Sequence, residues 1–342
     1  MKNILLALCL IITSCSSNQK ELHIYTWGDY ISTEVIEQFE KKFECRVIVD
    51  TYDSNESMYA KLKAGATGYD LIFPSNYFLD LLDKQQMLQP IHLDHLTNIQ
   101  NLDRHLLKII NADVNSTSIP YMISFSGIGY RSDRIAEMDD SWNAFGQKRW
   151  RGRMTMLNDY RETIGAGLKY LGYSINTKEG GEIDEAANQV IAWKKNLAKF
   201  DSEQYKNGIA TAEFLIVQGY SGDILQVMAE DEGVNFIYPT EGATISCDYL
   251  AIPRYAKDPN LAHAFINFLY EPAVSAKNIE HTLFICPNRE AYPLLPEYLA
   301  QNPVLFPSEA TLKKAELLLD VGADVVKYYE AWDKIKSSNG TL

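Results

Sequence analysis

Strand and helix patterns alternate along the first hundred residues. The apolar run 22–27 ends on Trp27 and predicts a strand. After Ser32, a residue type that often precedes helices, apolar residues follow at helical spacing. They are Val35, Ile36, Phe39 and Phe43. The β-rich stretch Cys45–Tyr52 predicts the next strand, and this alternation predicts a parallel sheet with crossover helices.

The alternation continues to about residue 90. The stretch "SNESMYAKLKAG" predicts a capped helix that ends at Gly65, "YDLIFPS" a short buried strand, and "NYFLDLLDKQQML" another helix. In parallel sheets, ligands bind beyond the carboxyl ends of the strands. Residues 27–30 and 75–77 lie at such ends, so we expect them to face a ligand.

The pattern changes at Ser118–Asp133, which is extended, contains glycine and predicts a crossing into a second lobe. This lobe is expected to contain a helix in "NDYRETIGAGLKYLGYS", a helix over Ile183–Phe200 and a turn at "QGYSGD". The chain is expected to return through "CDYLAIPRYA". Two crossings favour a hinge with a cleft between the lobes.

The last third of the chain supplies the remaining predicted helices of the two lobes. Asp258 and Pro259 are expected to begin a helix, and a final helical segment is expected over Ser308–Lys336. We therefore predict an α/β fold of two lobes, each a mixed, mostly parallel sheet flanked by helices. The predicted ranges are 22–123 and 247–292 for lobe 1, and 124–246 and 293–342 for lobe 2.

The first residues have the pattern of an export signal. Lys2 precedes a short apolar run, Ile4–Ile12, which is well below the ~20 residues of a spanning helix. "ITSC", ending at Cys15, resembles a bacterial lipobox, in which the cysteine becomes the lipidated first residue. We predict a signal peptide over 1–14 and a lipidated tether over 15–21; a plain signal peptide with a chance cysteine is the alternative.

Composition and charge narrow the ligand class. The 342 residues are 46% hydrophobic and 23% charged, as in ordinary globular proteins. Loss of the signal removes Lys2 and no acid, so the net charge changes from −13 to −14. Such a surface repels nucleic acid and weakly favours cations, although solubility alone also explains it. Of the remaining cysteines, Cys45, Cys247 and Cys286, we expect all to be buried rather than two to form a disulfide.

The sequence contains no strong enzyme motif. It has no phosphate-binding Gly-Lys loop, no Gly-x-Ser-x-Gly motif and no zinc-type His-Glu pair. His92 and His95 in "HLDH" could bind a metal with Asp94, but an exposed turn is the favoured interpretation. Asp159 and Glu162 could act as the acid and base of a hydrolase, which stays a minor alternative.

Carboxylates and aromatic rings are concentrated where the pattern places the cleft. The acids are Asp29, Asp159, Glu162, Asp223 and Asp248, and the rings are Trp27, Tyr30, Tyr77 and Tyr220. Carboxylates accept charge-assisted hydrogen bonds from ammonium groups, and a ring face attracts a cation by about 0.5–2 kcal/mol. The combination favours an organic cation. Asp159 and Glu162 could instead be stabilised by the N-terminus of the helix that they open.

The chain resembles the spermidine/putrescine-binding proteins of bacterial polyamine ABC importers over nearly all of its mature length. The segments that carry the resemblance are "YTWGDY", "TYDSNESMYAKLKAG", "YDLIFPSNYF", "LTNIQNLD", "SIPYMISFSGIGY", "DYRET", "DYLAIP" and "DVGA". The resemblance implies a two-lobed periplasmic-binding fold of type II that closes on a polyamine.

The resemblance also implies which residues bind. By position, the matching residues are Trp27, Asp29, Tyr30, Ser75, Tyr77, Asp159, Glu162, Tyr220, Asp223, Ser246 and Asp248. Tyr220 falls where a tryptophan is usual, Ser246 where a large aromatic is usual, and Leu318 near a usual glutamine. "YSGD", which ends at Asp223, is similar to putrescine-preferring members. These departures bear on the length of the ligand and on the affinity of the protein for it, and less on whether the ligand is a cation.

We therefore expect an exported, lipid-anchored solute-binding protein that captures putrescine or spermidine and delivers it to a membrane permease. It is expected to be a monomer without catalysis, cofactor, metal or nucleic-acid partner, and to contact the membrane through the anchor at Cys15. The alternatives are a binding protein for another small cation, such as a basic amino acid or a metal, and the hydrolase named above.

Overall fold

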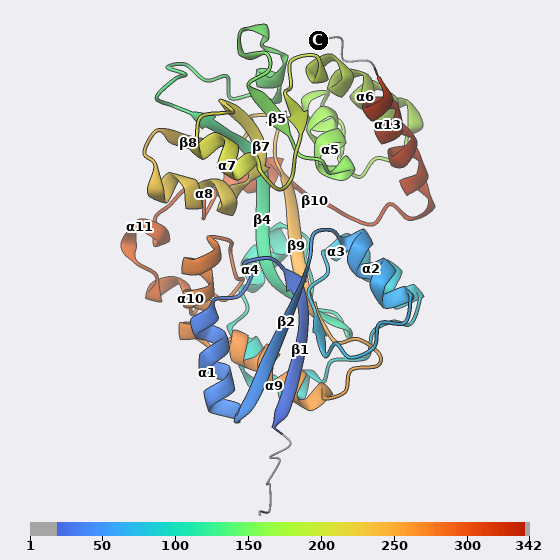
Figure 1. Ribbon diagram of the computed structural model, residues 1–342, viewed down its shortest axis with the longest axis vertical. Helices are drawn as coiled ribbons and strands as arrows, with labels where there is room; N and C mark the ends of the chain where they lie inside the picture. The colour runs from blue at the N-terminus through green and yellow to red at the C-terminus, as the bar shows by residue number, and fades with distance from the viewer. Residues whose placement is uncertain (1–18, 339–342) are drawn as a thin grey trace, which may run out of the picture.

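The structure, a computed structural model that describes residues 19–338, forms two lobes (Figure 1). Two long strands, β4 (Ser118–Arg131) and β9 (Thr244–Ala251), run side by side and antiparallel from one lobe into the other. They coincide with the two crossings predicted from the sequence. The predicted signal peptide and the lipidation site Cys15 lie outside the described residues.

Lobe 1, the lower lobe in Figure 1, is built on the strand order β2-β1-β3-β9-β4. β1 (Lys20–Trp27) lies parallel to β2 (Cys45–Tyr52) and to β3 (Leu71–Ile72), and β9 returns antiparallel to β3. The helices of this lobe are α1 (Thr33–Phe43), α2 (Asn55–Lys63), α3 (Asn76–Lys84), α4 (Arg104–Ile109), α9 (Pro259–Leu269) and α10 (Pro272–Thr282).

Local sequence accounts for these elements. In α1, Val35 and Phe39 are buried on one face, as their spacing predicts. Ser54 accepts a hydrogen bond from the backbone N–H of Ser57 and so caps α2, and Gly65 follows that helix with φ +92°. Asp258 caps α9, with Pro259 in the first turn, as predicted.

Lobe 2 continues the sheet through β4-β7-β5-β6, with β8 also paired to β4. Its strands are β5 (Met154–Met156), β6 (Lys199–Phe200), β7 (Ile216–Tyr220) and β8 (Val234–Ile237), and its helices are α5 (Tyr160–Tyr170), α6 (Gly180–Lys194), α7 (Tyr205–Ala210) and α8 (Ser221–Glu230). The connection from lobe 1 carries α11 (Glu297–Ala300), α12 (Glu309–Lys314) and β10 (Glu316–Leu317), and it leads to α13 (Val325–Ser337). Figure 1 shows α13 packed beside α5 and α6.

Three predicted elements were wrong in extent or type. The helix expected over Ile183–Phe200 ends at Lys194, and the chain turns into the short strand β6. "QGYSGD" is not a turn, because β7 passes directly into α8 there. The segment Ser308–Lys336 contains two helices separated by β10 and the short 3-10 helix Gly322–Asp324, since Leu317 and Leu318 are buried beside β9.

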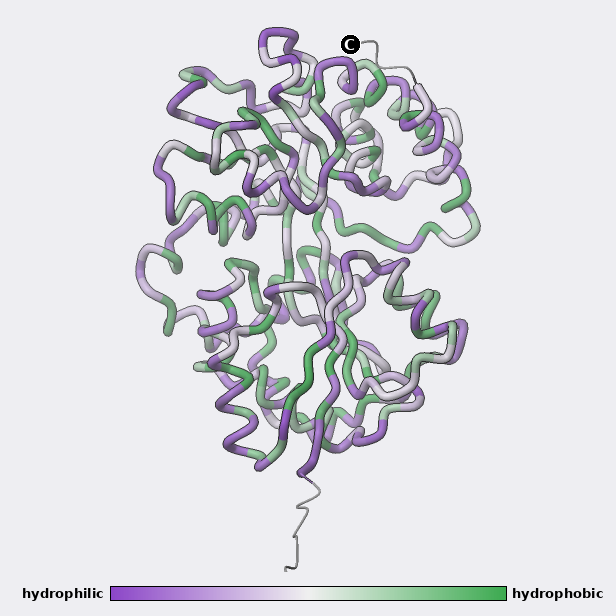
Figure 2. Tube along the Cα trace, in the orientation of Figure 1, coloured by the Kyte–Doolittle hydropathy of each residue, from purple (hydrophilic) through white to green (hydrophobic). Residues whose placement is uncertain are grey.

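Hydrophobic residues follow the central strands, and hydrophilic ones dominate the outer loops (Figure 2). One buried cluster fills lobe 1 and extends along the crossing strands to α7, α8 and β8 of lobe 2, and a second fills the rest of lobe 2 around Trp142 and Trp193. Cys45, Cys247 and Cys286 are all buried and unpaired, as expected. Within residues 19–338, no helix is both long enough and apolar enough to cross a membrane.

Candidate ligand-binding site between the lobes

Asp248 on β9 is a buried carboxylate of lobe 1. Tyr30 donates its hydroxyl hydrogen to one carboxylate oxygen at 2.5 Å, and Ser75 donates to the other at 2.5 Å. Burial raises the pKa of Asp248 to about 6, although the two hydroxyl donors oppose this rise. These three predicted residues come together from β9 and from the loops after β1 and β3.

Asn55, a residue that the sequence did not single out, organises this group further. Its amide nitrogen donates to the hydroxyls of Ser75 and Tyr77, both at 3.0 Å, and its carbonyl oxygen accepts the backbone N–H of Ser75 at 3.0 Å. Asn55 is buried although it lies in the first turn of α2, at the carboxyl end of β2. That position was the available signal, because the other site loops also follow strand ends.

Trp27 and Asp29 extend the site along the end of β1. The indole N–H of Trp27 donates to the carbonyl of Phe73 at 3.0 Å, and its ring packs edge-on against Tyr52. Asp29 is exposed and has φ +52°, so the backbone turns sharply just after the strand. This turn directs the chain from β1 into the Tyr30 loop.

In lobe 2, Asp159 caps α5. One of its carboxylate oxygens accepts the backbone N–H groups of Arg161 and Glu162 at 2.8 and 3.0 Å. For that oxygen the alternative interpretation is therefore correct: the N-terminus of the helix stabilises the acid. Burial raises the pKa of the Asp159 carboxyl in spite of these bonds.

Glu162 lies one turn further along α5, with only 1% of its surface exposed. Its Oε1 accepts the hydroxyl hydrogen of Ser246 at 3.2 Å, whereas Oε2 has no hydrogen-bond partner among the described residues. The hydroxyls of Ser126 on β4 and Thr244 on β9 are likewise buried without a partner in that part of the chain. Burial, with the nearby charge of Asp159, raises the pKa of Glu162 to about 8.

Tyr220 and Asp223 stand where β7 passes into α8. The hydroxyl of Tyr205 donates to Asp223 and accepts the backbone N–H of Tyr220 at 3.2 Å. Burial raises the pKa of Asp223, and Asp29 of lobe 1 adds to that rise from across the gap. Burial also raises the pKa of Tyr220 well above its usual value, with contributions from Glu162, Asp159 and Tyr77.

The two lobes thus bring their predicted residues together: Asp159 of lobe 2 adds to the raised pKa of Tyr77, Tyr77 of lobe 1 adds to that of Tyr220, and Asp29 adds to that of Asp223. A cavity of ≈ 310 Å³ between α3 and α5 is lined by Tyr77 and Tyr160. Leu318, by contrast, is buried, and its backbone carbonyl accepts the side-chain amide of Asn76. Its side chain does not replace the polar group that the resemblance suggested.

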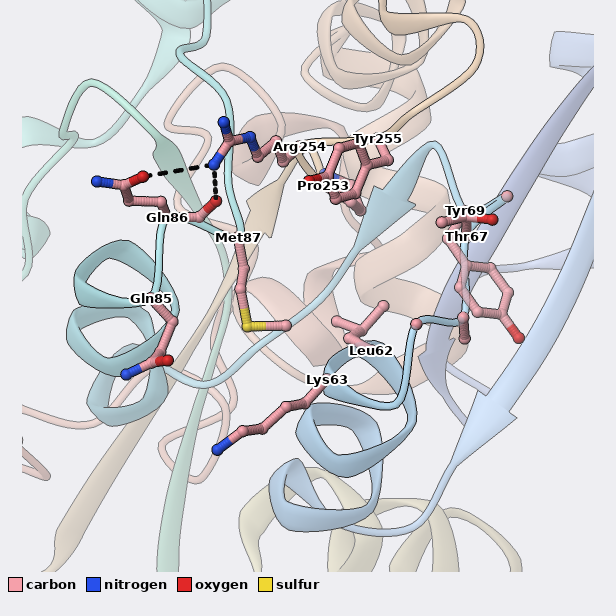
Figure 3. Close-up of a pocket in the computed structure, with 13 residues that line it drawn as sticks. Leu62, Lys63, Thr67, Tyr69, Gln85, Gln86, Met87, Pro253, Arg254 and Tyr255 are labelled. Carbon is pink, nitrogen blue, oxygen red and sulfur yellow. Dashed lines mark hydrogen bonds between the residues drawn. The ribbon is translucent and has the colours of Figure 1, made fainter.

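Two further features lie away from these residues. His92 and His95 belong to a three-histidine cluster with His263, but residues 19–338 contain no group of His, Cys, Asp or Glu that could hold a metal ion. A cavity of ≈ 280 Å³ on lobe 1, shown in Figure 3, is lined by Met87, Arg254 and neighbours, and it includes none of the predicted site residues.

The fold and the site agree with similarity to known proteins. Residues 34–307 match the family described as bacterial extracellular solute-binding protein. The chain belongs to this family. It is 34% identical over 324 residues to the spermidine/putrescine-binding periplasmic protein of Escherichia coli (strain K12), with 94% of this chain and 93% of the relative covered. It is 33% identical to the putrescine-binding periplasmic protein SpuD of Pseudomonas aeruginosa, with the same coverage.

Solved structures confirm the expected fold class. The Tp0655 (TpPotD) lipoprotein of Treponema pallidum has a TM-score of 0.85 and 33% identity, with 92% of this chain and 99% of that chain covered. The family assignment confirms the resemblance inferred from the sequence and makes this chain a member of a solute-binding rather than an enzyme family.

Proposed function

We propose that this protein captures a polyamine, putrescine or spermidine, between its lobes and delivers it to the permease of an ABC importer. The relatives named above are described as binding these two compounds. The observation that carries the proposal is the set of carboxylates from both lobes. None of Asp29, Asp159, Glu162, Asp223 and Asp248 forms an ion pair with a Lys, Arg or His within residues 19–338.

The chemistry of the site fits amines on an apolar chain. Asp248 would take one ammonium, with the hydroxyls of Tyr30 and Ser75 keeping the carboxylate oriented. Asp159 and Glu162 would bind ammonium charge from the side of lobe 2. Asp29 and Asp223 would bind it at the other end of the ligand. The rings of Trp27, Tyr77 and Tyr220 would cover methylene groups and attract the charges. Ser246 would orient Glu162 in place of an aromatic ring.

Ligand-driven closure is the proposed mechanism. Carboxylates on opposite lobes repel one another when the site is empty, and a cation between them removes this repulsion, so the ligand favours the closed arrangement through contacts that exist only there. The proposed lobes are 22–123 with 247–292, and 124–246 with 293–342. Packing of α13 on α5 and α6 supports the assignment of the C-terminal segment.

Export, the lipid anchor at Cys15 and a monomeric state are further parts of the proposal. The relatives are described as periplasmic, and the Treponema pallidum structure is described as a lipoprotein. Radiolabelled palmitate should enter the wild-type protein in a bacterial host and should not enter Cys15→Ala; equal labelling of both would contradict the anchor.

Isothermal titration calorimetry of the mature domain tests the ligand. Putrescine and spermidine should bind at micromolar concentrations or below, with arginine and lysine as matched cationic controls. Binding of a basic amino acid without binding of either polyamine would replace this proposal with the alternative ligand class. Absence of binding for all four would refute an organic cation.

A further inference from the structure

The segment 317–320 joins the two lobes at a place that the proposed site does not include. It starts in β10, which pairs with Thr244 and Ile245 of β9. It ends at Asp320, the first residue of the "DVGA" motif, which carried part of the resemblance and has no role in the proposed site. The contacts of its successive residues alternate between the lobes.

One set of contacts fixes this segment to lobe 2. The buried guanidinium of Arg161 on α5 donates to the carbonyl of Leu319 at 3.0 Å. The side-chain amide of Asn176 donates to the carbonyl of Leu317 and accepts the backbone N–H of Leu319, both at 2.9 Å. The segment therefore moves with lobe 2.

The residues between these contacts reach α3 of lobe 1. Asn76, the first residue of α3, donates its side-chain amide to the carbonyl of Leu318. Lys84, the last residue of α3, forms an ion pair with Asp320 at 3.3 Å. Both sequence neighbours of Asn76 belong to the proposed site, so the helix that contacts this segment also carries part of that site.

The cavity of ≈ 310 Å³ between the lobes shows that α3 and the chain after residue 319 face each other. Tyr77, Leu81 and Lys84 line it from α3, and Asp320 and Val325 line it from the opposite side. Among the described residues, Asp320 is the only acid in this lining. The ion pair with Lys84 therefore bridges the two walls of the cavity.

The opposite side of the molecule, where α8 meets the end of α10, shows that the lobes are closed on each other (Figure 1). Gln226 of α8 donates to the carbonyl of Thr282 at 3.1 Å. One turn earlier, a Cβ at Gly222 would lie 2.6 Å from the ring of Phe284 and 2.8 Å from the carbonyl oxygen of Leu283. The contacts of α3 described above therefore belong to the closed arrangement, and separation of the lobes would break them.

We propose that Lys84 and Asp320 form a latch that holds the closed cleft around the polyamine. A lysine near a site for cations weakens binding by repulsion unless it makes a compensating contact. The ion pair with Asp320 is that contact, and it resists the motion that would carry α3 away from lobe 2. Both are positioning residues, because they act through closure. This inference rests on the proposed function.

A double-mutant cycle on polyamine affinity tests the latch. In calorimetry with putrescine and spermidine, Lys84→Gln and Asp320→Asn should each weaken binding by about two- to fivefold, the range for an exposed ion pair. The double variant should bind no more weakly than the weaker single one. Asparagine retains the oxygen that accepts the N–H of Gly322, a bond of 2.7 Å in the wild type, so the turn is kept. In stopped-flow measurements the loss should appear as faster release.

The sign of the effect of Lys84→Gln separates the latch from general electrostatics. Without a latch, removal of a positive charge near a bound cation should leave the affinity unchanged or raise it. Lys277→Gln is the matched control, because Lys277 of α10 pairs with Glu34 of α1 and both belong to lobe 1. Its affinity should stay within about twofold of wild type, since its ion pair does not change on closure.

The outcomes separate this inference from the proposed function. If the wild-type protein binds polyamines and Lys84→Gln binds them equally or more tightly, there is no latch and only this inference fails. Losses that add in the double variant would also overturn it, because the two residues would act independently. Thermal unfolding without ligand should match wild type, and a clear loss of stability would show that the pair is merely structural. If the wild-type protein binds no polyamine, the proposed function fails and this inference fails with it.

Discussion

Binding of a cation should release a proton from Glu162. This carboxyl is buried and takes one hydrogen bond from Ser246, and the nearby hydroxyls of Ser126 and Thr244 also oppose the rise of its pKa. The titratable groups that face it are Asp159 of its own helix, Tyr205 of α7 and Tyr220 at the end of β7. None of these groups supplies a positive charge.

The size of the effect follows from the pKa of about 8. At pH 7, about nine-tenths of the empty protein would carry a proton on Glu162. A nearby ammonium favours the ionised form and lowers this pKa, so nearly one proton should leave for each ligand bound. Affinity should therefore rise with pH, by up to about tenfold per pH unit below 8, and level off above it.

The assay is calorimetry at pH 7 in two buffers with different ionisation enthalpies, which yields the number of protons released. The pH range 7–8.5 favours Glu162, because Asp248, with a pKa of about 6, is then mostly ionised. Glu162→Gln should abolish the release and flatten the pH profile. Asp223→Asn is the control, because it removes another half-buried acid of lobe 2 whose pKa is raised, and it should leave the release in place.

A release near zero for the wild-type protein at pH 7 would refute the reasoning, because Glu162 would then be ionised before the ligand arrives. A release that persists in Glu162→Gln would show that another group titrates.

Three further predictions follow from the same contacts. Asp248→Ala should reduce polyamine affinity by at least about 100-fold in calorimetry, because it removes a carboxylate and leaves the hydroxyls of Tyr30 and Ser75 without their acceptor; wild-type affinity would show that the ligand binds elsewhere. Tyr220→Trp should tighten binding by about two- to tenfold, since indole is the stronger cation–π partner; unchanged or weaker binding would mean that this ring does not cover a charge. Glu162→Gln should change the pH dependence of stability. The stabilising contribution of the raised pKa is complete below 4.5 and is lost as pH rises through about 8, so in urea unfolding the variant should gain about 4 kcal/mol over wild type between pH 5 and pH 9; a constant difference would contradict the raised pKa.

Local patterns in the sequence were sufficient for most elements. Apolar spacing predicted α1, and the strand over Cys45–Tyr52 has the predicted bounds. Where the prediction was wrong, long-range contacts decided the outcome. The segment after Ser308 has helical composition, yet it forms β10 because Glu316 and Leu317 pair with Thr244 and Ile245 on β9.

The residues of the candidate site likewise fall into those that the sequence indicated and those that only the structure revealed. The sequence indicated Trp27, Tyr30, Ser75 and Asp248 because polar and aromatic residues stood at strand ends and matched a known family. It did not indicate Asn55, whose buried amide bonds to Ser75 and Tyr77, 20 and 22 residues further along the chain. Its place after the end of β2 was the one signal, and a helix-opening asparagine alone does not distinguish that role from ordinary solvent exposure.

The sequence by itself predicted the α/β fold, because strand–helix alternation is a property of neighbouring residues, and its motifs resembled a known solute-binding family. Only the tertiary structure decided the state of the acids in the candidate site. Asp159 and Glu162 are three residues apart, yet one caps a helix and the other is buried beside hydroxyls from both crossing strands. Their ionisation depends on burial and on groups distant in sequence, and these exist only when the two lobes are folded together.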